Sequence, residues 1–215
     1  MQNKSSSNKL KLALGLALMG AATADKGADG RTNLIKNGDF ENPTVGSWKL
    51  FPNGVEGWSG KGIEIGKGKN YNKNWPNGAQ NQVAELDGDK NNYELGQKIQ
   101  LEKGTYTLSL DCAARNGQAL NTSEMEIVWN NQVIQKFAPK DYSINHLEME
   151  LPAIDGLNTL VLRGAGKVDG LGITVDNVEL YQGGSSGNLE KVETVNKEIK
   201  TQGKASTEGD NNQNV

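Results

Sequence analysis

Two carboxylates flank an apolar aromatic side chain near the start of the chain, in the segment NLIKNGDFENP at residues 33–43. Asp39 and Glu41 stand on either side of Phe40, directly after the turn-forming pair Asn37-Gly38. In one interpretation the carboxylates decorate a turn, where such side chains bond to nearby backbone groups. In the other they are half of a cation site, since Ca²⁺ binds hard oxygen ligands at about 2.3–2.6 Å. The segment alone leaves both interpretations open.

The other reactive side chains form no recognisable catalytic set. The single His146 lies on the outward phase of NHLEMEL, together with two glutamates. The single Cys112 shares the inward phase of its strand with leucines, so we expect a buried structural thiol. A nucleophile elbow, a paired-Cys metal site and a phosphate-binding loop are absent from the sequence. Acidic residues are plentiful, but no pair is identifiable as the two carboxylates of a glycosidase. The sequence therefore predicts that the protein is not an enzyme.

Alternation of apolar and polar residues with a period of two dominates from residue 32 onward, which is typical of short strands. In SEMEIVWNNQVIQKF, the pair Asn130-Asn131 predicts the turn of a hairpin. No convincing amphipathic helix separates the strands, so the crossovers that parallel sheets need are missing. The pattern predicts an all-β fold, an antiparallel β-sandwich. The expected strands lie within residues 32–41, 61–68, 82–88, 93–101, 104–115, 123–137, 145–151, 157–166 and 171–181.

The two ends of the chain differ from its centre. A basic start, a short apolar run and the small residues Ala22-Thr23-Ala24 predict a secretory signal peptide over residues 1–24. An uncleaved N-terminal anchor is the alternative. Residues 25–31 form a leader, residues 32–182 the β-sandwich domain, and residues 183–215 a hydrophilic tail with the composition of a disordered segment. We expect a protein that is secreted, periplasmic or on the cell surface, with no membrane span after signal cleavage.

The charge balance excludes one class of partner. The chain has 215 residues and a formal net charge of −3, with both signs mixed along its length. Proteins that capture DNA or RNA by electrostatic attraction carry clustered basic residues instead. Nucleic acid is therefore not an expected partner.

Four segments together resemble the galactose-binding-like β-jelly rolls found in many carbohydrate-binding modules and in related secreted surface or cell-wall domains. They are NLIKNGDFENP at the start of the domain, GSWKL with EGWS after it, GTYTLSLDCAAR in the middle, and GITVDNVELY at its end. In such modules a first strand carrying Asn-Gly-x-Phe-Glu lies beside a last strand carrying Asp-Asn-Val. The resemblance covers about residues 33–181, and it is the order and spacing of the segments that carries it.

The resemblance implies a structural calcium ion near the termini of the domain. First and last strands of a sandwich can be neighbours, so Glu41 and Asp176 can meet across the intervening chain. Asp39 would contribute its backbone carbonyl more than its side chain. The predicted metal ligands are Asp39, Glu41 and Asp176. The alternative, in which these residues bond only to nearby backbone groups, remains open.

The resemblance also implies that sugar rings stack on exposed aromatic side chains bordered by amides and carboxylates. Trp75 lies in the polar segment YNKNWPNG together with Tyr71, and Trp48 lies in another polar loop, so these three are candidate ligand-binding residues. Trp58 and Trp129 are expected in the core. Arg115, at the end of a strand, is a fourth candidate that would clamp a hydroxyl or carboxylate at the rim, or else a surface arginine without such a role.

We therefore expect a secreted, non-catalytic domain similar to carbohydrate-binding modules, with a structural calcium site and a polysaccharide or glycan as partner. A different class of function fits the same scaffold. The alternative is a structural or adhesive extracellular protein that binds other surface proteins.

Overall fold

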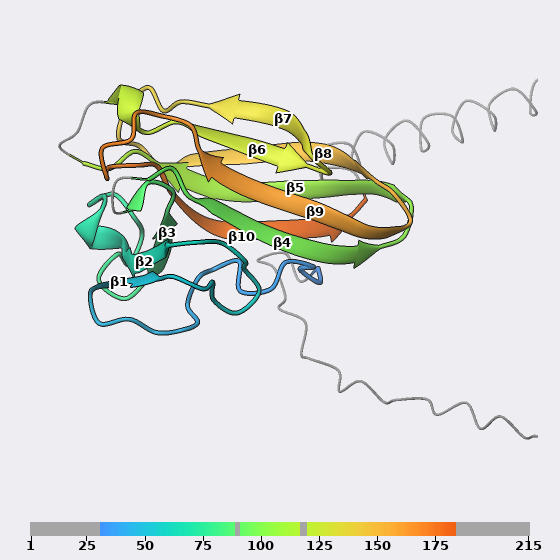
Figure 1. Ribbon diagram of the computed structural model, residues 1–215, viewed down its shortest axis with the longest axis horizontal. Helices are drawn as coiled ribbons and strands as arrows, with labels where there is room; N and C mark the ends of the chain where they lie inside the picture. The colour runs from blue at the N-terminus through green and yellow to red at the C-terminus, as the bar shows by residue number, and fades with distance from the viewer. Residues whose placement is uncertain (1–30, 89–90, 117–119, 184–215) are drawn as a thin grey trace, which may run out of the picture.

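The computed structural model describes residues 31–88, 91–116 and 120–183, and these residues form two antiparallel β-sheets (Figure 1). One sheet has the strand order β1-β2-β3-β10-β5-β8 and the other the order β4-β9-β6-β7. The predicted antiparallel β-sandwich is thereby confirmed. No helix in these ranges is long and apolar enough to cross a membrane. The strands are β1 (Trp48–Phe51), β2 (Ile63–Lys67), β3 (Gln82–Glu85), β4 (Glu94–Leu101), β5 (Gly104–Ala113), β6 (Met125–Trp129), β7 (Gln132–Phe137), β8 (Asn145–Ala153), β9 (Gly156–Gly164) and β10 (Thr174–Gln182).

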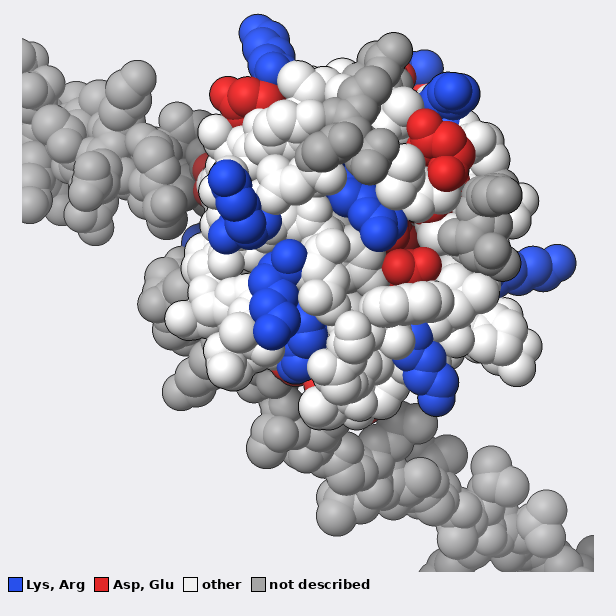
Figure 2. All heavy atoms as spheres, turned by 90° about the vertical axis from the view of Figure 1, so that its left-hand side faces the viewer, with Lys and Arg blue, Asp and Glu red and all other residues white. Residues whose placement is uncertain are grey.

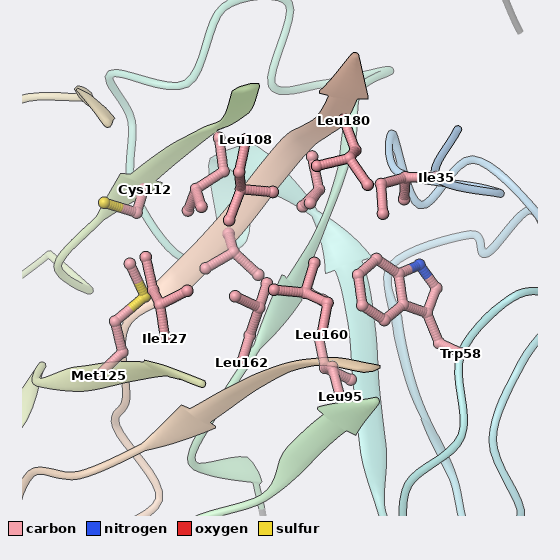
Figure 3. Packing of buried hydrophobic residues seen from close by; sticks show 14 of the residues in the cluster. Ile35, Trp58, Leu95, Leu108, Cys112, Met125, Ile127, Leu160, Leu162 and Leu180 are labelled. Atoms are coloured by element: carbon pink, nitrogen blue, oxygen red, sulfur yellow. The ribbon is translucent and has the colours of Figure 1, made fainter. Parts of the chain in front are cut away.

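The main core lies between the two sheets, where alternate side chains of each strand point inward. Figure 3 shows Leu108, Cys112 and Leu180 on one side of this layer, facing Ile127 and Leu162 on the other. Cys112 is fully buried, as the sequence predicts, and burial raises the pKa of its thiol to about 12. The predicted hairpin also forms: β6 and β7 pair across Asn130 and Asn131, which both have positive φ.

The predicted strand over residues 32–41 is wrong, although its predicted position beside the last strand is right. The segment runs along β10, with Leu34 N donating to Leu180 O at 2.9 Å and Val178 N donating to Gly38 O at 2.9 Å. Asn37 and Phe40 both have φ of 52°, a left-handed conformation that interrupts an extended strand. A Cβ on Gly38 would come within 2.0 Å of the Val178 carbonyl oxygen, so only glycine allows this approach.

A long connection, residues 68–81, covers the outer face of the first sheet. It begins with the short 3₁₀ turn η1 (Gly68–Asn70) and packs Tyr71 and Trp75 against Val83 and Ala113 in a second, smaller apolar cluster. The cluster buries polar side chains of the strands beneath it: Glu64, Glu85, Thr174 and Asp176. The outer face of this sheet is thus partly a second core.

Candidate functional site

Trp75 and Tyr71, the sequence candidates for stacking on a sugar, are both buried and only 3% exposed. The expectation that Trp75 is exposed in its polar loop is therefore wrong. Its partners come from strands distant in sequence: Trp75 Nε1 donates to Thr174 Oγ1 at 3.1 Å, and its ring packs with Val83 and Ala113. Neither aromatic ring presents a face to a ligand in this structure.

Arg115 lies beneath the same connection and is engaged by protein groups. Its Nη1 is 3.0 Å from both carboxylate oxygens of Glu85 and donates to Gly170 O at 3.2 Å. The guanidinium also stands over the Tyr71 ring, 5.2 Å from its centroid. Glu85 is fully buried, and the guanidinium offsets part of the cost of ionising its carboxyl group. The Arg115 side chain is 28% exposed and is held by an interior partner, and its role toward a ligand stays a prediction.

Two buried glutamates face each other beside Arg115. Glu64 and Glu85 occupy paired positions on β2 and β3, and the Tyr71 hydroxyl donates to Glu64 Oε1 at 2.9 Å. Burial raises the pKa of Glu85 to about 8, with the charge of Glu64 adding to the rise and Arg115 opposing it. Burial, followed by the charge of Glu64, also raises the pKa of Tyr71. These groups form a polar network in which Glu64, Glu85 and Tyr71 are buried and Arg115 is partly exposed.

Trp48 is the one sequence candidate with an exposed ring. It lies on the edge strand β1 and is 60% exposed. It borders a shallow hollow of about 250 Å³ together with Phe51 and Pro43. Trp58 and Trp129 are in the core, as expected, and each indole nitrogen donates to a backbone carbonyl.

Two carboxylates of the predicted calcium site accept hydrogen bonds from the neighbouring residues Asn81 and Gln82. Glu41 Oε1 accepts a hydrogen bond from Gln82 N at 2.7 Å, and Asp176 Oδ2 accepts one from Asn81 Nδ2 at 2.7 Å. Asp39 Oδ1 accepts from Glu41 N at 3.3 Å, which is the contact of a local turn. Within the described ranges, no three His, Cys, Asp or Glu side chains are grouped so as to hold a metal ion.

Asp176 is the buried member of this group, at 1% exposure. Burial raises the pKa of its carboxyl to about 8, and the charges of Asp111 and Asp39 add to the rise. Its other oxygen, Oδ1, accepts from Asn177 N at 2.8 Å. Hard oxygen donors of this kind suit Ca²⁺, but several of them already accept hydrogen bonds from the protein. The donor chemistry fits the ion, whereas the described side chains are not arranged as a ready-made centre.

A groove that the sequence did not reveal lies on the outer face of the second sheet, over β4 and β9. It has a volume of about 620 Å³. Outward residues of β4 and β9 form its floor, and the segment from Ser59 to Lys61 borders the free edge of β4, where Ser59 and Gly96 exchange two backbone hydrogen bonds of 2.8 Å. We call this the β4–β9 groove. Its lining residues are Ser59, Gly60, Lys61, Asn91, Asn92, Tyr93, Glu94, Gly96, Gln97, Lys98, Thr159 and Val161.

Tyr93 is the aromatic residue of the β4–β9 groove. Its backbone is held on both sides, by Tyr93 N donating to Leu86 O at 2.9 Å and Gly164 N donating to Tyr93 O at 3.1 Å. Its ring rests against Gly62, where a Cβ would come within 2.3 Å of the ring carbon Cζ. Because Gly62 has φ of +75° and no side chain, the half-buried ring keeps a fixed place beside the amides of Asn91 and Asn92.

The sequence carries one weak signal of this groove. The alternation of β4 places Leu95 on the inner face and Glu94, Gly96 and Lys98 on the outer face. A glycine inside a strand, such as Gly96, often marks a place where another backbone approaches closely. The outer face of a strand is polar whether it meets water or a ligand. The pattern alone therefore does not distinguish a groove from a solvated surface.

Comparisons with known proteins give two relatives by sequence, and no family model matches the chain. The multifunctional-autoprocessing repeats-in-toxin protein of Vibrio vulnificus is 32% identical over 149 residues. The protein of the same name from Vibrio cholerae serotype O1 (strain ATCC 39315 / El Tor Inaba N16961) is 30% identical over 148 residues. Each match covers 68% of this chain, which spans about 3% of the length of these relatives.

Carbohydrate-binding modules are among the solved structures that resemble this chain, as the sequence motifs implied. A family 16 module has a TM-score of 0.46 at 17% identity, with 70% of this chain and 100% of that chain covered. A family 35 module from Clostridium thermocellum has a TM-score of 0.44 at 12% identity, with 64% and 99% covered. At these TM-scores the likeness carries no argument about ligand or activity. Any such argument must come from the residues of the chain itself.

Proposed function

We propose that this protein binds a carbohydrate, without catalysis, in the β4–β9 groove. The observation that carries the proposal is the groove itself, in which a positioned tyrosine stands among amides and hydroxyls. Its volume of about 620 Å³ lies within the usual range of sites that hold small organic ligands. The proposal thus moves the binding site from the predicted Trp75 loop to the opposite sheet.

The lining residues suit a sugar chemically. A pyranose ring has an apolar face that packs on an aromatic ring, and the half-buried Tyr93 offers such a ring. Its hydroxyls both donate and accept hydrogen bonds. Asn91, Asn92, Ser59 and Thr159 supply matching donors and acceptors along the walls and floor.

The absence of catalysis in the proposal follows from where the carboxylates lie. Most glycosidases need two carboxyl groups that flank one glycosidic bond. Among the described residues that line the groove, Glu94 is the one carboxylate. Glu85 and Asp176, whose pKa values are raised as in catalytic acids, are buried on the other sheet. Binding without reaction is the function that this arrangement supports.

The proposal also includes secretion of the protein and a structural calcium ion. The signal peptide over residues 1–24 and the tail over residues 183–215 lie outside the described residues, apart from Gly183, and both stay predictions. For calcium, Asp176 would be the central side-chain ligand, supported by Asp39 and Glu41, and the ion would favour the ionised form of the buried carboxyl.

The test is a glycan array and polysaccharide pull-down with the full chain, in wild-type form and as Tyr93→Ala. We expect wild-type binding to at least one glycan and a loss of roughly tenfold or more in Tyr93→Ala, because the stacking ring is removed. Trp48→Ala is the matched control, since it deletes an exposed aromatic ring outside the groove. Retention on no glycan by a folded wild type would refute the proposal.

The alternative function, contact with another surface protein, has one observation in its favour. Trp48 is exposed on the free edge of β1, beside the hollow formed with Phe51. Exposed aromatic rings are enriched where proteins meet. If Trp48→Ala abolishes a pull-down partner while Tyr93→Ala has no effect on any glycan, this alternative replaces the first proposal.

A further inference from the structure

The charges of the β4–β9 groove indicate which glycans it takes, an inference that rests on the proposed function. We propose that the groove selects anionic polysaccharides, those whose sugar rings carry carboxylates, over neutral polymers of the same backbone. The argument depends on which charged side chains of this face are already paired and which remain available.

Four charged side chains of the outer face neutralise one another. Arg163 Nη2 is 2.6 Å from Glu126 Oε2, and Lys136 Nζ is 2.7 Å from Glu126 Oε1. Arg163 also reaches Glu94, with Nη1 at 3.6 Å from Oε1. Two acids and two bases thus form one connected row across β7, β6, β9 and β4. The carboxylate of Glu94, the negative group of the groove lining, is therefore already balanced.

Two lysines of the groove have no such partner. Lys61 and Lys98 are both exposed and both line the groove, and no described residue forms an ion pair with either. They come from different elements, Lys61 from the segment beside the β4 edge and Lys98 from the outward phase of β4 itself. A ligand in the groove would meet two lysines that no acidic side chain of the described residues neutralises.

The surrounding surface does not explain these charges as part of a general basic coat. The chain as a whole has a net charge of −3. At the end of the sandwich seen in Figure 2, basic and acidic side chains are interspersed on a largely uncharged surface. Unpaired lysines such as Lys103 also lie elsewhere on the described surface, so what distinguishes Lys61 and Lys98 is that both line one groove. The amides and the tyrosine beside them favour a sugar acid over a bare polyphosphate.

The test compares polygalacturonate with its methyl-esterified form, which has the same backbone without the charge. Affinities are measured for the full wild-type chain, for Lys61→Gln/Lys98→Gln, and for Lys103→Gln, an exposed lysine outside the groove. We expect the wild type to prefer the acidic form by roughly tenfold, and the preference to weaken as salt is raised. The double variant should lose the preference, and Lys103→Gln should keep it.

The possible outcomes separate this inference from the proposed function. If both forms bind equally and Tyr93→Ala still abolishes binding, the groove is a sugar site and the inference of anionic selectivity is overturned. If a single-stranded oligothymidylate binds as tightly as polygalacturonate, the lysines attract any polyanion and the inference is again overturned. If no glycan is retained at all, the proposed function fails together with it. Thermal unfolding of each variant confirms that it is folded.

Discussion

Gln82 shows how one residue can join distant parts of the chain. Its side chain is fully buried, with Nε2 donating to Phe40 O at 2.7 Å and Oε1 accepting from Val45 N at 2.6 Å. Its backbone N–H donates to Glu41. An amide has both donors and acceptors, so it satisfies backbone groups of opposite kind in one loop. The sequence suggested that a cation joins the segment over residues 33–43 to the rest of the domain. In the described structure, the side-chain amide of Gln82 makes such a connection.

We predict that Gln82→Ala strongly destabilises the domain. The substitution leaves Phe40 O and Val45 N buried without partners, and each unsatisfied buried group costs about 1–3 kcal/mol. The expected loss for the two groups is therefore on the order of 2–6 kcal/mol in urea unfolding. Gln100→Ala, at an exposed position of β4, should change stability by less than about 0.5 kcal/mol. Equal stabilities of the two variants would contradict the role assigned to Gln82.

At the scale of the elements, the long strands are predictable from the sequence. The non-strand segments that pack beside them are not. Alternation in β4, β5 and β9 is a local property, so the sequence alone predicts these strands. The segment over residues 32–41 alternates as well, but positive φ at Asn37 and Phe40 interrupts it, and that backbone state is supported by contacts from β10 and β3. The strand β1 is short and has no clear alternation, and it was missed.

The sequence predicts an exposed Trp75 in the 68–81 connection, and this prediction is wrong for a related physical reason. The connection's own sequence is polar, so Trp75 has no apolar neighbour along the chain. The residues that bury it, Val83, Ala113 and Thr174, are brought there by three different strands. Tertiary contacts of this kind leave no trace in local composition. For Trp48 the predicted exposure is confirmed, although the residue lies on strand β1 and not in a loop, and its role in binding stays a prediction.

We predict that Trp75→Ala destabilises the protein far more than Trp48→Ala does. Truncating a buried tryptophan costs about 3–5 kcal/mol, from the lost apolar contacts and the cavity left behind. Removing a ring that is 60% exposed costs much less, about 1 kcal/mol or below. Urea unfolding of both variants measures the difference. A larger loss in Trp48→Ala would show that the 68–81 connection does not cover the sheet as described.

At the scale of the whole molecule, two buried carboxyl groups link folding to pH. The pKa of Asp176 is raised from 3.8 to about 8, and that of Glu85 from 4.5 to about 8, in both cases chiefly by burial. Between about pH 4 and pH 8 the folded state therefore holds protons that the unfolded state has released. Because a raised pKa means more bound protons in the folded state, the contribution of these groups is full at the acidic end and is lost as the pH rises toward 8.

We therefore predict that, in a chelator-containing buffer, these two groups lower the stability of the protein as the pH rises from 5 to 8. Asp176→Asn removes one of them, so its thermal midpoint should fall less over this range than that of the wild type, by several degrees (roughly 5 °C). The calcium proposal adds a second effect. A bound divalent ion stabilises the ionised carboxyl, so calcium should raise the midpoint of the wild type most at pH 8 and leave Asp176→Asn unchanged. If calcium moves neither midpoint at either pH, Asp176 is a buried acid that holds Asn81 and Asn177, and the calcium proposal is wrong.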